Sequence, residues 1–207
     1  MNLVIIHISR CGGTVIRKTL KKYNIEFTTI HIQKVKFKEN KKYIIVLRNP
    51  ISRFISAFNW RYKTIILDKT KYKTPKTREY TILKKYNDVN NLAENIESYN
   101  DDPTMEYLHH IYEDINYYLS DFIRDCKSEN ILGVITQENL NEDFKKLFKI
   151  DIDINVKSKI NDSSLSKTIS NLGYKLLKEY LWKDYRCIKK LYNMNCLTEK
   201  QYEVLSK

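Results

Sequence analysis

The apolar positions in the first 60 residues form short buried runs that alternate with amphipathic stretches. Residues 3–8 and 41–47 are almost continuously apolar, and residues 25–32 are rich in β-branched side chains, so the pattern predicts three strands. In residues 14–23 and 51–62 apolar positions recur every three or four residues, which predicts helices. This order predicts an α/β fold, in which helices flank a central, mostly parallel sheet.

The remainder of the chain is less regular. For residues 64–127 the sequence pattern predicts a variable excursion of helices and loops, in which a longer helix runs from residue 102 to residue 126. A fourth strand is predicted at residues 130–136. Further helices are predicted at residues 141–148, at residues 165–194 with a break near Gly173, and at residues 198–205. Residues 1–207 are interpreted as one domain.

The charge of the chain is strongly positive. Lysine and arginine number 37 against 25 aspartate and glutamate residues, so the formal net charge is +12 with neutral histidine. Such a charge favours an anionic partner such as a nucleotide, an acidic glycan, an anionic lipid or a nucleic acid. The lysine-rich segments 34–42 and 63–76 are candidates for steering that partner, and they are equally interpretable as solvated surface.

Several classes of protein are disfavoured. No run of about 18 apolar residues is present, which predicts no membrane span, and the polar start does not resemble a signal peptide. A cytoplasmic location is therefore expected. None of the cysteines has the C-x-x-C spacing of zinc sites or redox dithiols, so reduced thiols are expected. They are Cys11, Cys126, Cys187 and Cys196.

A first candidate for chemistry is the stretch HISRCGGTV at residues 7–15. It predicts a strand, a turn that contains Gly12 and Gly13, and the start of a helix. This geometry directs backbone N–H groups and the positive helix end toward one point, which suits a phosphate. The stretch lacks the first glycine and the lysine of the Walker pattern. An ordinary tight turn between strand and helix is the alternative interpretation.

A second candidate is LRNPISRFISAF, residues 47–58. Arg48 ends a predicted strand, at the edge where open α/β sheets bind ligands. Ser52 and Ser56 are four residues apart on the next predicted helix and therefore share one face. An arginine and a serine can hold a phosphate together. The alternative is a helix start with ordinary capping and a solvated arginine.

Both motifs resemble those of the PAPS-dependent carbohydrate sulfotransferases, the family of the Golgi heparan and chondroitin enzymes. HISRCGGT is similar to that family's H-I-P-K-T-G-G-T turn, and LRNPISRFISAF is similar to its R-[DN]-P-x-x-R-F-x-S-x-[FYW] segment. VITQENLNEDFKKLFKI, residues 134–150, resembles more loosely the family's strand, E-x-L-x-x-D motif and short helix. Residues 64–127 match no motif of the family. The resemblance implies a P-loop-like sulfotransferase fold.

The resemblance also implies a substrate pair: PAPS as donor, which leaves PAP as product, and a hydroxyl acceptor, usually a carbohydrate. An anionic glycan is one candidate acceptor, which the lysine-rich segments could steer. Arg48 and Ser56 would hold the 3′-phosphate, and no metal is implied. The 5′-phosphosulfate would lie on Arg10, Cys11, Gly12, Gly13, Thr14 and Val15. Arg10 replaces the family lysine that contacts the bridging oxygen; it keeps the positive charge but cannot lose a proton.

The acceptor hydroxyl must lose a proton, and histidine is the usual base near neutral pH. In the family a histidine just after the second strand often has this role, which makes His31 the first candidate. His7 is expected to be a core residue inside the first strand. His109 and His110 are alternatives in the unassigned middle of the chain. Glu138, in the E-x-L motif, is expected to be structural.

Two other functions remain open. A nucleotide-dependent, kinase-like phosphotransferase would share the phosphate-binding turn, although the Walker lysine and a clear Mg²⁺ carboxylate after a strand are missing. A basic nucleic-acid-binding protein without catalysis would explain the charge. For that function the chain has no zinc spacing, RNP motif or helix-turn-helix pattern.

Overall fold

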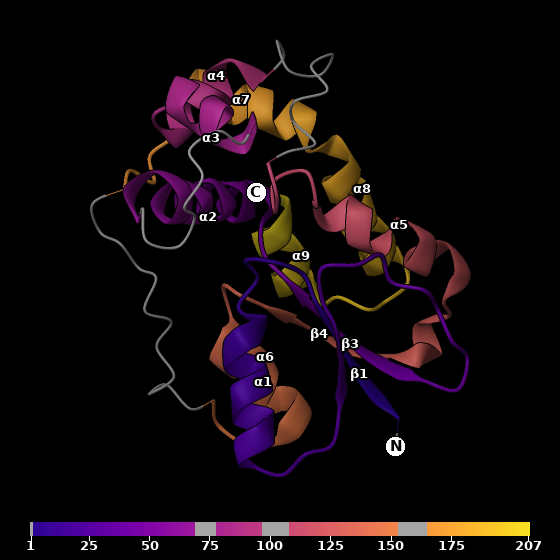
Figure 1. Ribbon diagram of the computed structural model, residues 1–207. Coiled ribbons are helices and arrows are strands. Elements are labelled where there is room, and N and C mark those ends of the chain that lie inside the picture. Colours follow the sequence, from indigo (N-terminus) through magenta and orange to yellow (C-terminus); the bar gives the residue numbers. More distant parts are fainter. Residues whose placement is uncertain (1, 69–77, 97–107, 153–164) are drawn as a thin grey trace. The chain divides into compact units, whose positions relative to one another are not determined.

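The structure of this protein is a computed structural model that describes residues 2–68, 78–96, 108–152 and 165–207 (Figure 1). The chain divides into two compact units. Unit 1 comprises Met1–Pro50, Asp114–Lys159 and Lys183–Lys207, and unit 2 comprises Ile51–Glu113 and Ile160–Trp182. Unit 1 contains the sheet, and unit 2 is helical in its described parts.

Unit 1 is built on a four-stranded sheet in which every neighbouring pair of strands is parallel. Its strands are β1 (Leu3–His7), β2 (Thr28–Ile30), β3 (Lys42–Leu47) and β4 (Ile131–Thr136), and their order across the sheet is β2-β1-β3-β4. The predicted α/β fold with a parallel sheet flanked by helices is confirmed. The second strand is shorter than the predicted range of residues 25–32. Parallel strands bring all four carboxyl ends to the same edge, where ligands of such sheets bind.

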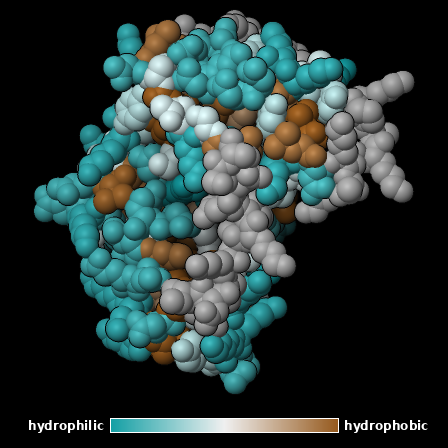
Figure 2. Space-filling view, turned by 90° about the vertical axis from the view of Figure 1, so that its left-hand side faces the viewer, coloured by the Kyte–Doolittle hydropathy of each residue, from teal (hydrophilic) through white to brown (hydrophobic). Residues whose placement is uncertain are grey.

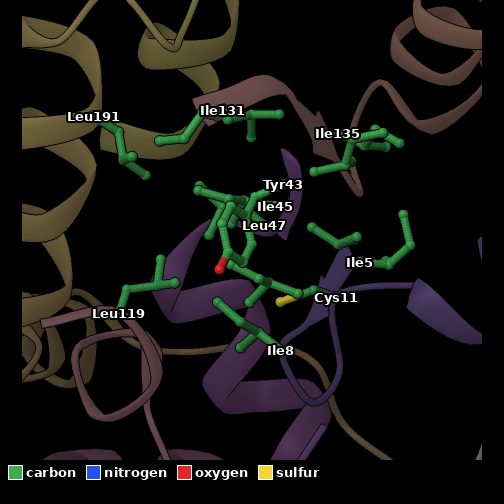
Figure 3. Close-up of a cluster of buried hydrophobic side chains, with 14 of the residues drawn as sticks. Ile5, Ile8, Cys11, Tyr43, Ile45, Leu47, Leu119, Ile131, Ile135 and Leu191 are labelled. Atoms are coloured by element: carbon green, nitrogen blue, oxygen red, sulfur yellow. The ribbon is translucent and has the colours of Figure 1, made fainter. Parts of the chain in front are cut away.

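The central strands are buried on both sides, which explains their almost continuous apolar sequences. β1 is buried throughout and pairs with β3 in a register that sets Ile5 beside Ile44 and Ile6 beside Ile45. Figure 3 shows the resulting core, in which Leu119 and Leu191 face the sheet from helices. Cys11, from the turn after β1, also lies in this cluster and is fully buried.

Two pairs of helices cover the two faces of this sheet (Figure 1). On one face lie α1 (Gly13–Lys22) and α6 (Leu140–Phe148), and a Cβ at Gly133 of β4 would lie 2.6 Å from Leu147 of α6. On the other face lie α5 (Ile115–Asp125) and α8 (Trp182–Asn193). There the ring of Phe122 lies 4.8 Å from that of Tyr43. The buried Asp184 carboxylate of α8 accepts the backbone N–H of Asn116, which ties α8 to the start of α5.

The C-terminal helix α9 (Glu199–Ser206) begins at a complete capping box of Thr198 and Gln201. The Gln201 side chain is buried and donates to the backbone oxygen of Val134 in β4, at 2.9 Å. The last residues of the chain are therefore attached to the sheet that carries the candidate site. Helices predicted at residues 141–148 and 198–205 are confirmed as α6 and α9.

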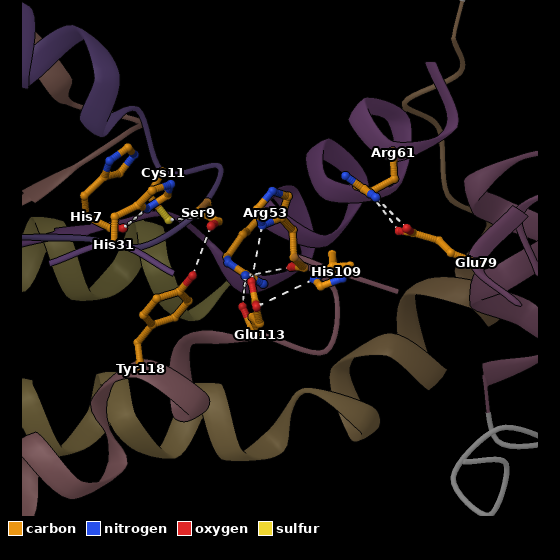
Figure 4. Close-up of polar contacts among 11 residues, drawn as sticks. His7, Ser9, Cys11, His31, Arg53, Arg61, Glu79, His109, Glu113 and Tyr118 are labelled. Carbon is orange, nitrogen blue, oxygen red and sulfur yellow. Dashed lines mark hydrogen bonds and ion pairs between the residues drawn. The ribbon is translucent and has the colours of Figure 1, made fainter. Parts of the chain in front are cut away.

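Unit 2 contains α2 (Pro50–Tyr62), which continues into a π-helical turn (Lys63–Leu67), and the helices α3 (Arg78–Lys85), α4 (Val89–Glu94) and α7 (Asn171–Tyr180). A buried ion pair joins α2 to α3, since Nε of Arg61 donates to Glu79 at 2.7 Å (Figure 4). α7 begins at Ser170, whose backbone N–H donates to Asn90 of α4. The sequence thus indicated helices in this region but not their boundaries.

Two helix predictions are wrong in detail. The break predicted near Gly173 lies at Leu181, between α7 and α8. Gly173 instead lies inside α7 where a Cβ would come 3.1 Å from Ala93 of α4, so it permits a close approach of two helices. The long helix predicted from residue 102 begins only at Ile115, after the capping carboxylate of Asp114. Residues 102–107 lie outside the described residues.

Candidate functional site

The loop from β1 to α1 has an unusual backbone conformation. Arg10 and Gly12 have positive φ angles of 69° and 88°, and Gly12 is the N-cap of α1. Gly12 offers no side chain that could cap this helix, and the first turn of α1 contains no acidic residue. The N–H groups and the positive end of the helix dipole are therefore arranged to attract an anion.

The two adjacent glycines are explained by the backbone and packing of the protein itself, since Gly12 has a φ angle of 88° and Gly13 packs against the ring of His7. A Cβ at Gly12 would lie 2.0 Å from Oε1 of Gln137, and a Cβ at Gly13 would lie 2.1 Å from the ring of His7. The glycines therefore accommodate residues from the ends of β4 and β1, and the same packing holds the helix N-terminus at the sheet edge.

The other residues of the turn differ in what they expose. Cys11 is fully buried, and its Sγ donates a weak hydrogen bond to the Ser9 carbonyl at 3.7 Å (Figure 4). The hydroxyls of Ser9 and Tyr118 lie 3.0 Å apart and connect the turn to α5. Cys11 can therefore offer a ligand only its backbone. Thr14, in the first turn of α1, is exposed, and Val15 is half-buried.

Arg48 joins the second motif to the first. Its Nη1 donates to the backbone oxygen of Arg10 at 3.3 Å, so the guanidinium at the end of β3 lies against the turn that follows β1. The next residue, Asn49, donates its backbone N–H to Oε1 of Glu138 at 3.0 Å. Asn49 is also anchored by its side chain, which donates to the oxygen of Lys207 at 2.9 Å. Glu138 therefore fixes the end of β3, which agrees with the structural role expected for it.

The serines of the second motif lie on α2. Ser52 and Ser56 are both half-buried and share one face of that helix. Ser56 belongs to unit 2 and Arg48 to unit 1, so their joint action on one phosphate stays a prediction. Arg53 is only 1% exposed and donates to the backbone oxygens of His110 and Glu113 (Figure 4). Arg53 therefore stabilises unit 2 through these hydrogen bonds.

His31 follows β2 directly and is oriented by His7. Its Nδ1 lies 2.8 Å from the His7 carbonyl oxygen, and the two rings are stacked 4.2 Å apart at an angle of 11° (Figure 4). Because a carbonyl oxygen can only accept, Nδ1 of His31 carries the hydrogen in this contact. The neutral ring then has its lone pair on Nε2, which is the form that a general base requires.

His7 is a core residue, as expected. It is 5% exposed, and burial lowers the pKa of its imidazole from 6.5 to about 3, with further lowering by the positive charges of His31, Arg17 and Arg10. His7 is therefore neutral at physiological pH. Arg10, Arg17 and His31 are therefore close enough to the neutral His7 ring to act on it electrostatically.

The other two histidines belong to unit 2. His109 is exposed, with Nδ1 3.8 Å from Oε1 of Glu113, and His110 is less exposed, with Nδ1 3.5 Å from Oε2 of the same carboxylate. The His110 ring lies 4.9 Å from that of Trp60. These contacts assign the two histidines to a local cluster around Glu113.

Sequence reasoning missed two residues of the site. Gln137 follows β4 directly, the same strand-end position that singled out Arg48, and its carboxamide lies over Gly12. Its backbone N–H donates to Leu47 at the end of β3, at 2.8 Å. Arg17 lies one helical turn beyond Gly13 and acts electrostatically on His7. Gln137 could have been identified from the sequence, because it follows an apolar strand directly. Arg17 could be identified only from the structure, which shows how α1 packs.

In the described parts of the chain, no cluster of His, Cys, Asp or Glu residues is suited to a metal ion. Nor do these parts contain a helix with the length and apolar character needed to cross a membrane. Figure 2 shows one face of the molecule, which is mainly hydrophilic with small, separate apolar areas. Comparison of the chain with protein-family models, with curated proteins and with solved structures finds no match.

Proposed function

We propose that this protein transfers a sulfuryl group from PAPS to a hydroxyl of a carbohydrate acceptor. The observation that carries the proposal is the hydrogen bond from Arg48 to the backbone of Arg10. It brings the two motifs that resemble those of the sulfotransferases together at one uncapped helix N-terminus. The proposal therefore rests on two independent sequence motifs that meet at one strand edge, as donor binding requires.

The residues present suit the donor. Arg10 and Arg48 supply two guanidinium groups, and the first turn of α1 supplies backbone N–H donors without a competing carboxylate. Arginine binds phosphate and sulfate oxygens through a fork of donors. The 5′ end of the donor would lie on the turn, from Arg10 to Val15. Arg48, with Ser56 as its predicted partner, would hold the 3′-phosphate.

PAPS supplies a sulfuryl group on a phosphate that leaves as part of PAP. Arg10 and the N-terminus of α1 stabilise the negative charge that develops on the phosphate oxygen when the S–O bond breaks. Nε2 of His31 accepts the proton of the acceptor hydroxyl while that oxygen forms the new bond to sulfur. The hydrogen bond from Nδ1 to the His7 carbonyl then stabilises the imidazolium that results. The remaining contribution is positioning, as in phosphoryl transfer.

A thermal-shift panel with PAP, NAD and ATP with Mg²⁺ tests this function. We expect PAP alone to raise the melting temperature, because only PAP fills both phosphate sites. A rise with ATP and none with PAP would favour the kinase-like alternative. No shift with any nucleotide, together with salt-dependent binding of DNA, would favour a nucleic-acid-binding protein.

A further inference from the structure

β2 forms one edge of the sheet. It has three residues, Thr28–Ile30, and pairs with β1 on one side only in the described sheet. An edge strand presents backbone N–H and C=O groups that another strand can pair with. What lies on the two faces of this edge decides which strand could bind there.

A hollow lies on each face of β2. The first has a volume of about 590 Å³ and lies on the α1 face, where Arg17 and Lys21 contribute to its lining. The second has a volume of about 490 Å³ and lies on the opposite face, where Tyr43 contributes to its lining. Both hollows share Thr28, Thr29 and Lys41. Successive side chains of a strand point to opposite faces, so a strand added beside β2 would direct alternate side chains into the two hollows.

The second hollow is lined by a row of three lysines, Lys34, Lys36 and Lys38. Between them Val35 and Phe37 pack into the core, so exposure alternates as it does in an extended chain. Two backbone N–H groups hold this segment in place. That of Val35 donates to the backbone oxygen of Tyr118 at 3.2 Å, and that of Lys38 donates to the hydroxyl of Tyr43 at 2.9 Å. The lysines are therefore about 6.6 Å apart along the chain, which is also the spacing of alternate residues in a facing strand.

The charge around β2 is unbalanced. Six basic residues line the two hollows, against the single acidic residue Glu26. They are Arg17, Lys21, Lys34, Lys36, Lys38 and Lys41. In the described part of the chain none of the three row lysines is within salt-bridge distance of a carboxylate. Among the described residues, the positive charge around β2 is therefore largely unbalanced and would attract a negatively charged partner.

We propose that the β2 edge binds an extended acidic segment of a partner protein, which adds to the sheet as a fifth strand with alternate acidic side chains in the second, lysine-lined hollow. Backbone hydrogen bonds to β2 would supply affinity, and the lysine row would select acidic side chains at alternate positions. This proposal does not depend on sulfuryl transfer, because it uses the outer edge and faces of β2 and none of the residues assigned to the donor or to proton transfer; of the residues of the candidate site only Arg17 also lines a hollow.

Other partners fit the same edge less well. A second copy of this chain would bring its own basic edge against the first, and like charges oppose that pairing. A single-stranded nucleic acid needs exposed aromatic faces on which bases stack. Tyr43 is only 1% exposed, and the other aromatic lining residue, Phe27, is packed against the core. An acidic peptide needs neither feature.

The test uses the full chain and a fluorescent ten-residue peptide of alternating glutamate and valine, with binding followed by anisotropy at two salt concentrations. The double variant Lys36→Glu/Lys38→Glu should bind the peptide at least about tenfold more weakly, since two ion pairs become repulsive. The control Lys189→Glu/Lys190→Glu on α8 has the same net charge and should stay within about twofold of wild type. If both double variants lose the same peptide affinity, the binding depends only on general charge attraction and the proposal is overturned.

Two further probes test how the peptide binds and what class of partner binds. Peptides N-methylated at odd or at even positions keep their charge but lose alternate backbone donors. Strand addition requires that one of the two binds much more weakly, and equal binding of both would overturn it.

A ten-residue oligothymidine should bind more weakly than the peptide. If it binds more tightly and the lysine-row variant abolishes that binding, the partner is a nucleic acid and the proposal fails.

Discussion

Nδ1 of His31 donates to the backbone oxygen of His7 at 2.8 Å, and the His31 ring is stacked on that of His7. One contact gives the two adjacent imidazoles different chemical roles. His31 is left with a basic Nε2, whereas burial keeps His7 neutral and inert. The pairing follows from the parallel register of β1 and β2, which sets Ile6 beside Ile30 and thus His7 beside the next residue, His31.

Replacement of His31 by alanine should therefore affect the rate more than the binding of nucleotide. We expect kcat to fall about 10²–10⁴-fold, the usual cost of removing a positioned base, while PAP affinity is unchanged. Steady-state kinetics and calorimetry on the same preparation measure both. The control is His109→Ala, at an exposed histidine of unit 2, which should keep full activity. A folded His31→Ala protein with normal kcat would show that the base lies elsewhere.

Removal of the Arg48 side chain should weaken PAP binding. Arg48→Ala deletes a guanidinium held against the donor turn, and a hydrogen bond to a charged group contributes about 1.5–3 kcal/mol. Isothermal titration calorimetry with PAP measures the loss. Arg124→Ala, at an exposed arginine paired with Asp125 on α5, controls for the loss of one positive charge. If both variants bind PAP as wild type does, Arg48 does not contact the nucleotide.

Arg10 should act mainly on the transition state. Because its φ angle is 69°, asparagine is a suitable neutral replacement, as it tolerates this conformation better than alanine does. Arg10→Asn should lower kcat more than it lowers PAP affinity, because the substitution removes the positive charge that would stabilise the leaving phosphate in the transition state. Arg10→Lys should recover much of the rate. Equal kcat values for wild type and Arg10→Asn would leave the turn with a structural role only.

Strands β1, β3 and β4 could be predicted from the sequence because each is a short apolar run whose signal is local, whereas β2 was indicated only by its β-branched residues and its bounds were predicted too long. Arg48 could also be singled out, since it follows such a run directly. The packing of Gln137 over Gly12 could not, because it joins distant parts of the chain through tertiary packing alone. Gly173 was misassigned for the same reason: its close neighbour Ala93 lies on another helix, so the glycine looked like a helix breaker.

The contact between Gly12 and Gln137 can be tested by a double-mutant cycle. Gly12→Ala places a Cβ at φ 88° and 2.0 Å from Oε1 of Gln137, so we expect a loss of about 1–3 kcal/mol in the free energy of unfolding. Gln137→Ala in the same protein should recover the part due to the steric clash and leave the part due to backbone strain. Urea denaturation of the four proteins gives the coupling energy. Additive effects would mean that the two residues do not interact in solution.

The buried imidazole of His7 should make stability depend on pH in a defined range. In the folded protein its pKa is about 3, whereas an unfolded histidine titrates near 6.5. The unfolded chain therefore binds the proton first as the pH falls. The stability that neutral His7 provides is complete above pH 6.5 and is lost progressively toward pH 3, by up to about 1.4 kcal/mol per pH unit.

His7→Phe isolates this effect. Phenylalanine keeps a flat ring against Gly13, and the replacement breaks no hydrogen bond of Nδ1, for which the described residues supply no partner. At pH 7.5 the variant should differ from wild type by less than about 1.5 kcal/mol, because the volumes are similar. As the pH is lowered to 4.5, the variant should gain stability relative to wild type, since it has no group that protonates on unfolding. Urea denaturation at intervals of one pH unit measures the difference, which is insensitive to carboxylates that titrate equally in both proteins. Curves that stay parallel from pH 7.5 to 4.5 would show that His7 titrates normally and that the ring stacked on His31 is accessible to water.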